Sequence, residues 1–199
     1  MKKIILASSN QGKIREIQAI IKDAEVLSLK DAEELLGKQI VVTEEQDTFE
    51  GNALEKVRGL YEQVGSGYIC IADDSGLSID ALDGFPGVFT ARWMDADDHT
   101  KNLELIKKVD ASGDNSRICH YTTVIALKSD TEEKCFESTL DGTVADHCRG
   151  DNGFGFDEIF VLPDGSTLAE IDMDTKNQLS PRRKALDELK QYMNNKEEA

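Results

Sequence analysis

The feature that most constrains this chain is an apolar run followed at once by a helical pattern. Lys3–Ala7 has the pattern of a short buried strand, and Ile14, Ile17, Ile20 and Ile21 then recur at the three- and four-residue spacing of a helix. A strand that leads directly into a helix is the usual building unit of parallel sheets. The opening of the chain therefore predicts an α/β fold.

Strands of a second kind are expected in the later part of the chain. Ile118–Leu127 and Lys134–Ala145 are rich in strand-forming residues, and the polar turn Ser129–Glu133 joins them, which predicts an antiparallel hairpin. Parallel units beside a hairpin predict a mixed sheet with flanking helices. The other strands expected are Glu25–Leu29, Tyr68–Ala72, Leu77–Asp80 and Ile159–Leu162, and the other helices are Ala32–Leu36, Phe49–Val64 after the cap Thr48, Asp98–Val109 and Pro181–Asn194.

Length and charge exclude several classes of protein. With 199 residues we expect a single domain over residues 1–199. The formal net charge of −16 argues against a partner such as a nucleic-acid polymer or an anionic membrane, but leaves room for a small anionic ligand in one pocket. No apolar run reaches the roughly 18 residues of a membrane span. The four cysteines are scattered without a CxxC pair, so we expect a reducing, cytoplasmic setting.

The loop after the first strand is a candidate anion site. Ser8, Ser9, Asn10, Gln11, Gly12 and Lys13 lead into the first helix, whose N-terminal N–H groups and positive dipole end suit phosphate. Lys13 adds a full positive charge, although the P-loop pattern is absent. The alternative is an ordinary turn in which Asn10 caps the helix.

Carboxylates supply a candidate metal site. Asp73 and Asp74 follow the expected strand Tyr68–Ala72, and oxygen ligands of this kind suit Mg²⁺. The alternative is a polar turn. Glu44 belongs to an acidic stretch before Thr48; such a stretch favours a helix N-terminus, and it also offers a further metal ligand.

Two later segments could contact a nucleoside. Phe154, Gly155, Phe156 and Asp157 combine aromatic rings with a carboxylate, which suits a planar base, although a tight turn with core rings is as good an interpretation. Cations cluster near the start of the last helix, where the dipole disfavours them, so an anion is expected to compensate them. These cations are Lys176, Arg182, Arg183 and Lys184. The structural alternative is that the acidic run Glu170–Asp174 supplies the compensating charge.

The histidines give little support for a soft-metal site. In Cys119-His120 and His147-Cys148, adjacent residues of a strand would face opposite sides and would not converge. No structural-zinc spacing is present, and His99 is isolated in the sequence.

The order of these motifs is more specific than any one of them. It resembles the inosine/xanthosine triphosphate pyrophosphatase family, the house-cleaning dITP/XTP pyrophosphatases, from residue 3 to about residue 190. The motifs that carry the resemblance are Ser8-x-Asn10-x-x-Lys13, Phe49-x-x-Asn52-Ala53-x-x-Lys56, Ala72-Asp73-Asp74-Ser75-Gly76-Leu77, Pro86-Gly87-Val88-x-x-Ala91-Arg92, Gly153-Phe154-Gly155-Phe156-Asp157-x-Ile159-Phe160, and Lys176 with Ser180-x-Arg182.

The resemblance implies a fold and an activity. The fold would be an elongated mixed sheet with flanking helices and two lobes around a central cleft, usually as a homodimer. The activity would be Mg²⁺-dependent hydrolysis of deaminated purine nucleoside triphosphates (ITP, dITP, XTP) to the monophosphate and pyrophosphate.

The resemblance also implies roles for individual residues. Asp74 would be the general base and a metal ligand, and Glu44 would be the second ligand. Ser8–Lys13 would hold the triphosphate, with Lys13 as its main cation and Lys56 assisting. The residues that would contact the rest of the substrate are Ser75, Phe154, Gly155, Phe156, Asp157, Lys176, Pro181 and Arg182.

One position departs from the family pattern. The family usually has Ser-His-Arg where this chain has Ser180-Pro181-Arg182, and proline cannot donate to a base as imidazole does. We therefore expect relaxed or shifted purine selectivity. The alternative functions are a Maf-like pyrophosphatase acting on dTTP or UTP, and a non-catalytic nucleotide sensor on the same fold.

Overall fold

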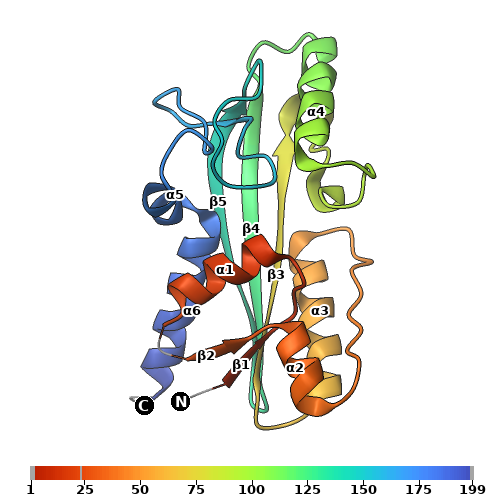
Figure 1. The fold of residues 1–199 in the computed structure, drawn as a ribbon, viewed down its shortest axis with the longest axis vertical. Helices are drawn as coiled ribbons and strands as arrows, with labels where there is room; N and C mark the ends of the chain where they lie inside the picture. The colour runs from red at the N-terminus through yellow and green to blue at the C-terminus, as the bar shows by residue number, and fades with distance from the viewer. Residues whose placement is uncertain (1–2, 23, 198–199) are drawn as a thin grey trace. The chain divides into compact units, whose positions relative to one another are not determined.

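A computed structural model describes residues 3–22 and 24–197. It contains strand–helix units in the first part of the chain and consecutive strands in the later part, as the sequence predicts (Figure 1). In chain order they are β1 (Lys3–Leu6), α1 (Gln11–Ile20), β2 (Glu25–Leu27), α2 (Leu29–Leu36), α3 (Phe49–Val64), β3 (Ile69–Ile79), the 3₁₀ turns η1 (Asp80–Leu82) and η2 (Gly87–Phe89), α4 (Asp98–Ser112), β4 (Ile118–Lys128), β5 (Glu133–Val144), β6 (Phe160–Val161), α5 (Met173–Leu179) and α6 (Pro181–Glu197).

The strands form one mixed sheet in the order β2-β1-β3-β4-β5-β6. β1 pairs in parallel with β2 and with β3, with Ile5 opposite Leu27 and Cys70. β5 pairs antiparallel with β6, with Val144 opposite Phe160. β4 and β5 are neighbours in the sheet and are joined by a short turn. Because parallel strands need a long crossover connection, these two strands form an antiparallel hairpin. The predicted mixed α/β sheet is confirmed.

The structure corrects two predicted elements. Tyr68–Ala72 and Leu77–Asp80 are not separate strands, because β3 runs without interruption from Ile69 to Ile79. Asp73 and Asp74 therefore lie inside a strand rather than in a turn that follows one. Helix α5 was not predicted; it is a short helix whose N-cap Asp172 accepts from the backbone N–H of Thr175.

The chain divides into two compact units, and β3, β4 and β5 contribute residues to both. Unit 1 comprises residues 1–74, 123–138 and 182–199, and unit 2 comprises residues 75–122 and 139–181.

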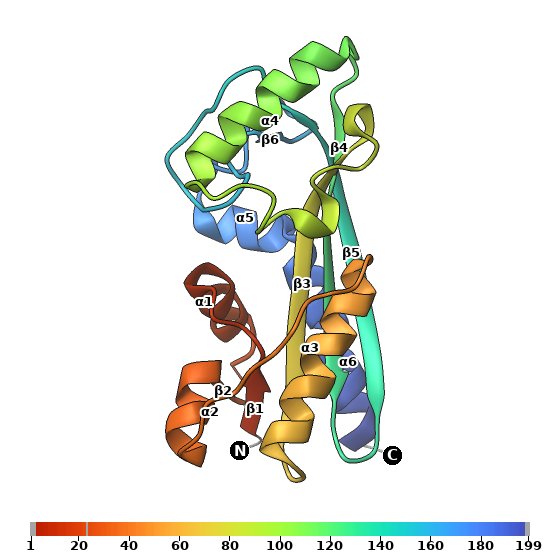
Figure 2. The same ribbon diagram turned by 90° about the vertical axis from the view of Figure 1, so that its right-hand side faces the viewer.

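Unit 1 contains two hydrophobic clusters. One joins α1 and α6 to the sheet through residues such as Ile17, Ile71 and Leu186. The other joins α3 to the sheet through residues such as Leu60, Cys70 and Ala72. Successive residues of a strand point to opposite faces, so the two clusters cover the two faces of the sheet. Figure 2 shows α3 in front of the sheet and α6 behind it.

Unit 2 is organised around a third cluster. Leu105 and Val109 of α4 pack with Tyr121 of β4 and Phe160 of β6. Cys119 is buried in this cluster and Cys70 in the α3 cluster, and all four cysteines are unbridged. Among the described residues, no helix combines the length and apolar character needed to cross a membrane.

Candidate active site

Strand β3 sends two adjacent carboxylates to opposite faces of the sheet. Cys70 and Ala72 lie in the α3 cluster, and Asp74 continues that face. Ile71 lies in the α1 and α6 cluster, and Asp73 continues that one. Both aspartates are buried, at 1% and 6% exposure, so each needs compensating partners from the helices it faces.

Asp73 is held by two cations on its own face. The Arg182 Nε donates to Asp73 Oδ2 at 2.8 Å, and Lys13 forms an ion pair with Oδ1. Arg182 also donates to Glu16, and both of these side chains are buried. Burial alone would raise the pKa of Asp73, but the charges of Arg182 and Lys13 outweigh it and hold that pKa well below its usual range.

Asp74 belongs to a second group on the opposite face. Lys56 Nζ lies 3.0 Å from Asp74 Oδ1 and 2.6 Å from Glu44 Oε1, and it also donates to the Asp73 carbonyl oxygen at 2.7 Å. Asn52 Nδ2 donates to Asp74 Oδ2 at 3.3 Å. Burial raises the pKa of Asp74, and the nearby charge of Lys56 offsets this only in part.

Lys56 is not the solvated surface lysine that its position in a charged helix suggests. It is 3% exposed, on the inward face of α3. Burial would lower its pKa, but the charges of Asp74 and Glu44 raise it overall, so the side chain stays an ammonium. The Lys56 ammonium therefore holds the carboxylates of Glu44 and Asp74 close to each other.

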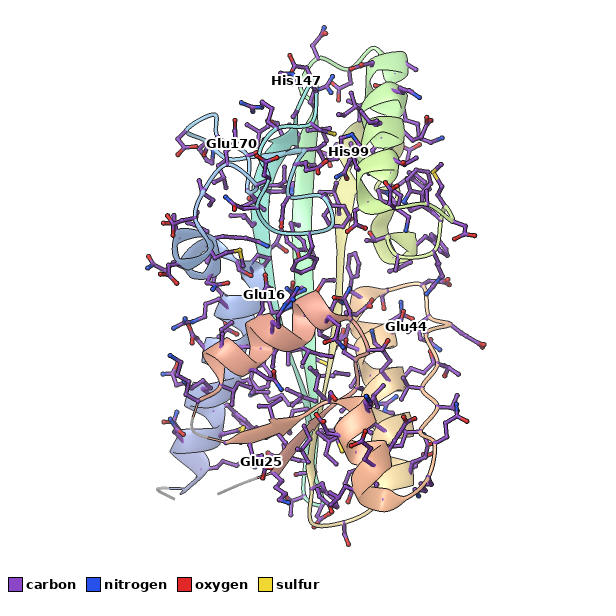
Figure 3. The ribbon with its side chains drawn as sticks, in the orientation of Figure 1. Glu16, Glu25, Glu44, His99, His147 and Glu170 are labelled. Carbon is purple, nitrogen blue, oxygen red and sulfur yellow. The ribbon has the colours of Figure 1, made fainter. Side chains whose placement is uncertain are left out.

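The loop that carries Glu44 is fastened to α3 by hydrogen bonds. Glu55 accepts from the Thr43 hydroxyl at 2.7 Å and from the Glu45 backbone N–H at 2.8 Å. Asn52 accepts from the Gln46 backbone N–H at 2.9 Å. Figure 3 labels Glu44 on this loop beside α3. It is Glu44, rather than Glu45, whose carboxylate contacts Lys56.

The Ser8–Lys13 segment has the capping geometry that the sequence offered as an alternative to anion binding. Asn10 is the N-cap of α1, and its Oδ1 accepts from the backbone N–H groups of Gly12 and Lys13 at 2.9 and 3.1 Å. The Asn10 backbone N–H donates to Ser8 Oγ at 3.2 Å. Ser9, Asn10 and Gln11 are exposed, and the Lys13 side chain is 18% exposed.

In unit 2 the Phe154–Asp157 segment is organised around one buried carboxylate. Asp157 Oδ2 accepts from the Phe154 backbone N–H at 2.7 Å and from Lys176 Nζ at 2.6 Å. The Lys176 ammonium also lies over the Phe154 ring, 4.6 Å from its centroid. Phe156 instead packs edge-on against Tyr121 in the core, so Phe154 is the ring better placed for a ligand.

Two candidate residues lie near these groups in the chain. Ser75 directly follows Asp74 in β3 and is partly buried. Pro181 is buried at the first position of α6, as predicted, and Ser180 before it closes α5.

Sequence reasoning missed Glu16 and gave no role to Asn52. Glu16 is three residues from Lys13 and four from Ile20, so helical periodicity places this carboxylate on the apolar face of α1. That position was a usable signal, since a buried carboxylate requires a buried cation.

Comparison with known proteins identifies the family of this chain. The family model described as Ham1 family matches residues 4–192. A dITP/XTP pyrophosphatase of Sulfurimonas denitrificans is 38% identical over 192 residues, covering 92% of this chain and 94% of that protein. One of Sulfurovum sp. is 40% identical, covering 98% and 96%. The Ham1 protein of Staphylococcus aureus superposes with a TM-score of 0.85 at 34% identity, covering 98% of this chain and all of the other. This chain therefore belongs to the Ham1 family, which confirms the resemblance found in the order of its motifs.

Proposed function

We propose that this chain hydrolyses deaminated purine nucleoside triphosphates, namely ITP, dITP and XTP, to the monophosphate and pyrophosphate. Full-length similarity to proteins named dITP/XTP pyrophosphatase supports the substrate class. The observation that carries the chemistry is the group in which buried Lys56 holds Glu44 and Asp74 together.

The donor set of this group fits a divalent metal ion. Glu44 and Asp74 present carboxylate oxygens within 3.0 Å of one ammonium, so both already surround a site of positive charge. Mg²⁺ prefers oxygen ligands and is commonly bound by one or two carboxylates together with substrate phosphates. We therefore assign Glu44 and Asp74 as the residues that would hold Mg²⁺. When bound there, the ion would neutralise charge on the phosphates during their transfer.

Asp74 is assigned as the general base. Its raised pKa makes its carboxylate a better proton acceptor than an exposed aspartate, and Asn52 and Lys56 fix the orientation of its two oxygens. In the proposed step, Asp74 takes a proton from a water molecule as the water oxygen attacks the α-phosphorus. The bond between the α-phosphorus and the oxygen that bridges it to the β-phosphorus then breaks, and pyrophosphate leaves.

Positive charge for the triphosphate comes from Lys13 and Lys56. An ammonium has three N–H donors, so Lys13 can keep its contact with Asp73 and still donate to a phosphate oxygen. Asn10 already occupies the N–H groups of Gly12 and Lys13. The hydroxyls of Ser8 and Ser9, the Gln11 amide and the Lys13 ammonium are then the groups of this segment that we assign to the phosphates.

We assign the nucleoside to Phe154, Gly155, Phe156, Asp157 and Lys176, with Ser75, Pro181 and Arg182. The Phe154 ring offers a stacking surface, and Lys176 offers a donor that a 6-oxo purine accepts and an adenine amino group does not. Arg182 donates to Asp73 and Glu16 and is 1% exposed, so a contact with a base would require the guanidinium to become accessible. A homodimer and a cytoplasmic location remain part of the proposal.

A nucleotide panel tests the function directly. The protein is incubated with Mg²⁺ and each of ITP, dITP, XTP, ATP, GTP, dTTP and UTP, and monophosphate and pyrophosphate are measured. We expect turnover of ITP, dITP and XTP well above ATP, and loss of activity on chelation of the metal. Preference for dTTP or UTP would support a Maf-like function, and no turnover at all would support a sensor. Asp47→Asn is the control for Asp74→Asn, because Asp47 is an exposed carboxylate of the same region.

A further inference from the structure

We propose that His99, Cys148 and Glu158 form a binding site for Zn²⁺ in unit 2. The three side chains come from separate segments: the first turn of α4, the loop after β5 and the segment before β6. Figure 3 labels His99 at the start of α4, beside the loops of unit 2. This set shares no residue with the group formed by Glu44, Lys56 and Asp74.

The donor atoms converge closely enough to share one ion. The imidazole, thiol and carboxylate donors all lie within 4.8 Å of one another. His99 Nδ1 is 2.8 Å from Glu158 Oε2, and the Cys148 thiol is hydrogen-bonded to Glu158. Ligand atoms around a tetrahedral zinc lie roughly 3–4 Å apart, so small side-chain movements would complete the geometry.

The backbone around the three residues is fixed by further hydrogen bonds. Asp98 accepts from the Gly155 backbone N–H at 2.8 Å, and Asn102 donates to the Gly155 carbonyl at 2.9 Å. Both bonds fasten the first turns of α4 to the segment that carries Glu158. The Arg149 backbone N–H donates to the Glu158 carbonyl at 3.0 Å, which holds the residue next to Cys148. The ligands therefore stand on segments that are already joined.

The chemistry of the donors selects zinc over magnesium. Thiolate sulfur and imidazole nitrogen suit Zn²⁺, whereas Mg²⁺ prefers an all-oxygen shell. Three protein ligands leave a fourth position for water, and the exposed His99 side chain, at 58%, gives solvent access to it. On binding, the Cys148 thiol releases its proton to solvent, and His99 would bind as a neutral imidazole through Nδ1 with its proton on Nε2.

Neighbouring side chains provide matched controls. His147 precedes Cys148, but its Nδ1 lies 2.6 Å from Asp146 and it is not part of the cluster. Cys135 is a second partly buried, unbridged thiol that belongs to unit 1. Substitution of these two residues changes the histidine and thiol content of the protein and leaves the proposed site intact.

The test uses Co²⁺ as a spectroscopic substitute for Zn²⁺ on the full-length protein. We expect one thiolate-bound Co²⁺ per chain, detected by a thiolate-to-cobalt charge-transfer band that Zn²⁺ removes by displacement. Co²⁺ bound by the carboxylates Glu44 and Asp74 would give no such band. Cys148→Ser should abolish the band. His99→Ala and Glu158→Gln should each weaken Zn²⁺ binding at least about tenfold, since loss of outer-shell partners alone has effects of that size. His147→Ala and Cys135→Ser should keep the charge-transfer band and the Zn²⁺ affinity of the unmodified protein.

Two results would overturn the proposal. One is a charge-transfer band that persists in Cys148→Ser, and the other is Zn²⁺ affinity that falls equally in His147→Ala and His99→Ala. His99 and Glu158 contribute partly exposed side chains, so these variants remain informative even if Cys148→Ser folds poorly. As a readout independent of the cobalt spectrum, Zn²⁺ should slow amide hydrogen exchange over residues 153–158 in the unmodified protein and not in Glu158→Gln.

Discussion

Lys56 and Lys176 are equally buried, at 3% exposure, yet they serve different arrangements. Lys56 in unit 1 joins two carboxylates, Glu44 and Asp74, and a backbone carbonyl. Lys176 in unit 2 contacts one carboxylate, Asp157, and an aromatic ring. We propose that the first group, with two carboxylates around one ammonium, accepts a divalent ion, whereas Lys176 and Asp157 fix a loop. Under the proposed function, a lysine buried to the same extent therefore supports chemistry in unit 1 and positions a loop in unit 2.

The largest expected effect is the loss of activity on substitution of Asp74, which lies in the group held by Lys56. Asp74→Asn keeps the shape of the side chain and removes the base, so we expect kcat to fall by about 10²–10⁴-fold. Pyrophosphate release measures this, and Asp47→Asn should leave it unchanged. Asp157→Asn in unit 2 should act mainly on KM. Comparable losses of kcat in both aspartate variants would remove the distinction between the two groups.

Asp73→Asn should affect stability more than Asp74→Asn does. It leaves the buried guanidinium of Arg182 with less compensating charge, and breaking a buried ion pair costs roughly 3–5 kcal/mol. Urea unfolding of both variants measures the difference. Equal losses in the two variants would show that the two faces of β3 are not specialised.

Asp73 also predicts how stability depends on pH. The pKa of Asp73 is lower in the folded state than in the unfolded state, where it is about 3.9. Its contribution to the free energy of unfolding is therefore fully present above that pH. The contribution is then lost as pH falls from about 4 towards the folded-state pKa. Unfolding free energy measured from pH 6 down to acid should therefore fall less steeply in Asp73→Asn than in the unmodified protein.

Alanine substitution of Gly153 and of Gly155 tests how much the loop around Asp157 contributes to stability. Gly153 has φ +84°, and a Cβ there would lie 2.0 Å from Asp157 Oδ2, which would displace the carboxylate that Lys176 holds. Gly155 has φ +66° with nothing within 4 Å, so alanine there meets backbone strain alone. We expect Gly153→Ala to lower the unfolding free energy by roughly 1–3 kcal/mol and Gly155→Ala by less. Thermal denaturation of the two variants measures this, and the reverse order would contradict the assignment.

The smallest expected effect concerns selectivity. Pro181→His restores an imidazole donor at the start of α6, and we expect a change of up to about tenfold in the ITP to GTP ratio of kcat/KM. The absolute rate with ITP should change little. Unchanged ratios across the nucleotide panel would exclude Pro181 as a determinant of selectivity.

Local patterns predicted most of the fold. The caps Asn10 and Thr48, the hairpin and the start of α6 at Pro181 depend on neighbouring residues and were read correctly. The uninterrupted course of β3 was missed, because adjacent aspartates followed by Ser and Gly are typical of turns. What keeps Asp73 and Asp74 in a strand is a set of partners from α1, α3 and α6, and local sequence does not contain them.

The candidate site was predicted from motif order rather than from local chemistry. Lysine is rarely buried, and the burial of Lys56 follows from its place on the inward face of α3. The His99, Cys148 and Glu158 cluster was missed because its members are distant in sequence, and because the alternating-face rule was applied to a loop. Contacts of this kind are set by topology.

The neighbouring positions of Asp73 and Asp74 limit how a chain of this kind can change in evolution. Deletion or insertion of a single residue in the first half of β3 would exchange the faces of both carboxylates. Asp73, which pairs with Arg182, would then face α3, and Asp74, which pairs with Lys56, would face α1 and α6. Substitutions can accumulate around this strand one at a time, but its length cannot drift by one residue. We therefore expect length variation among relatives to concentrate in surface loops and to spare β3.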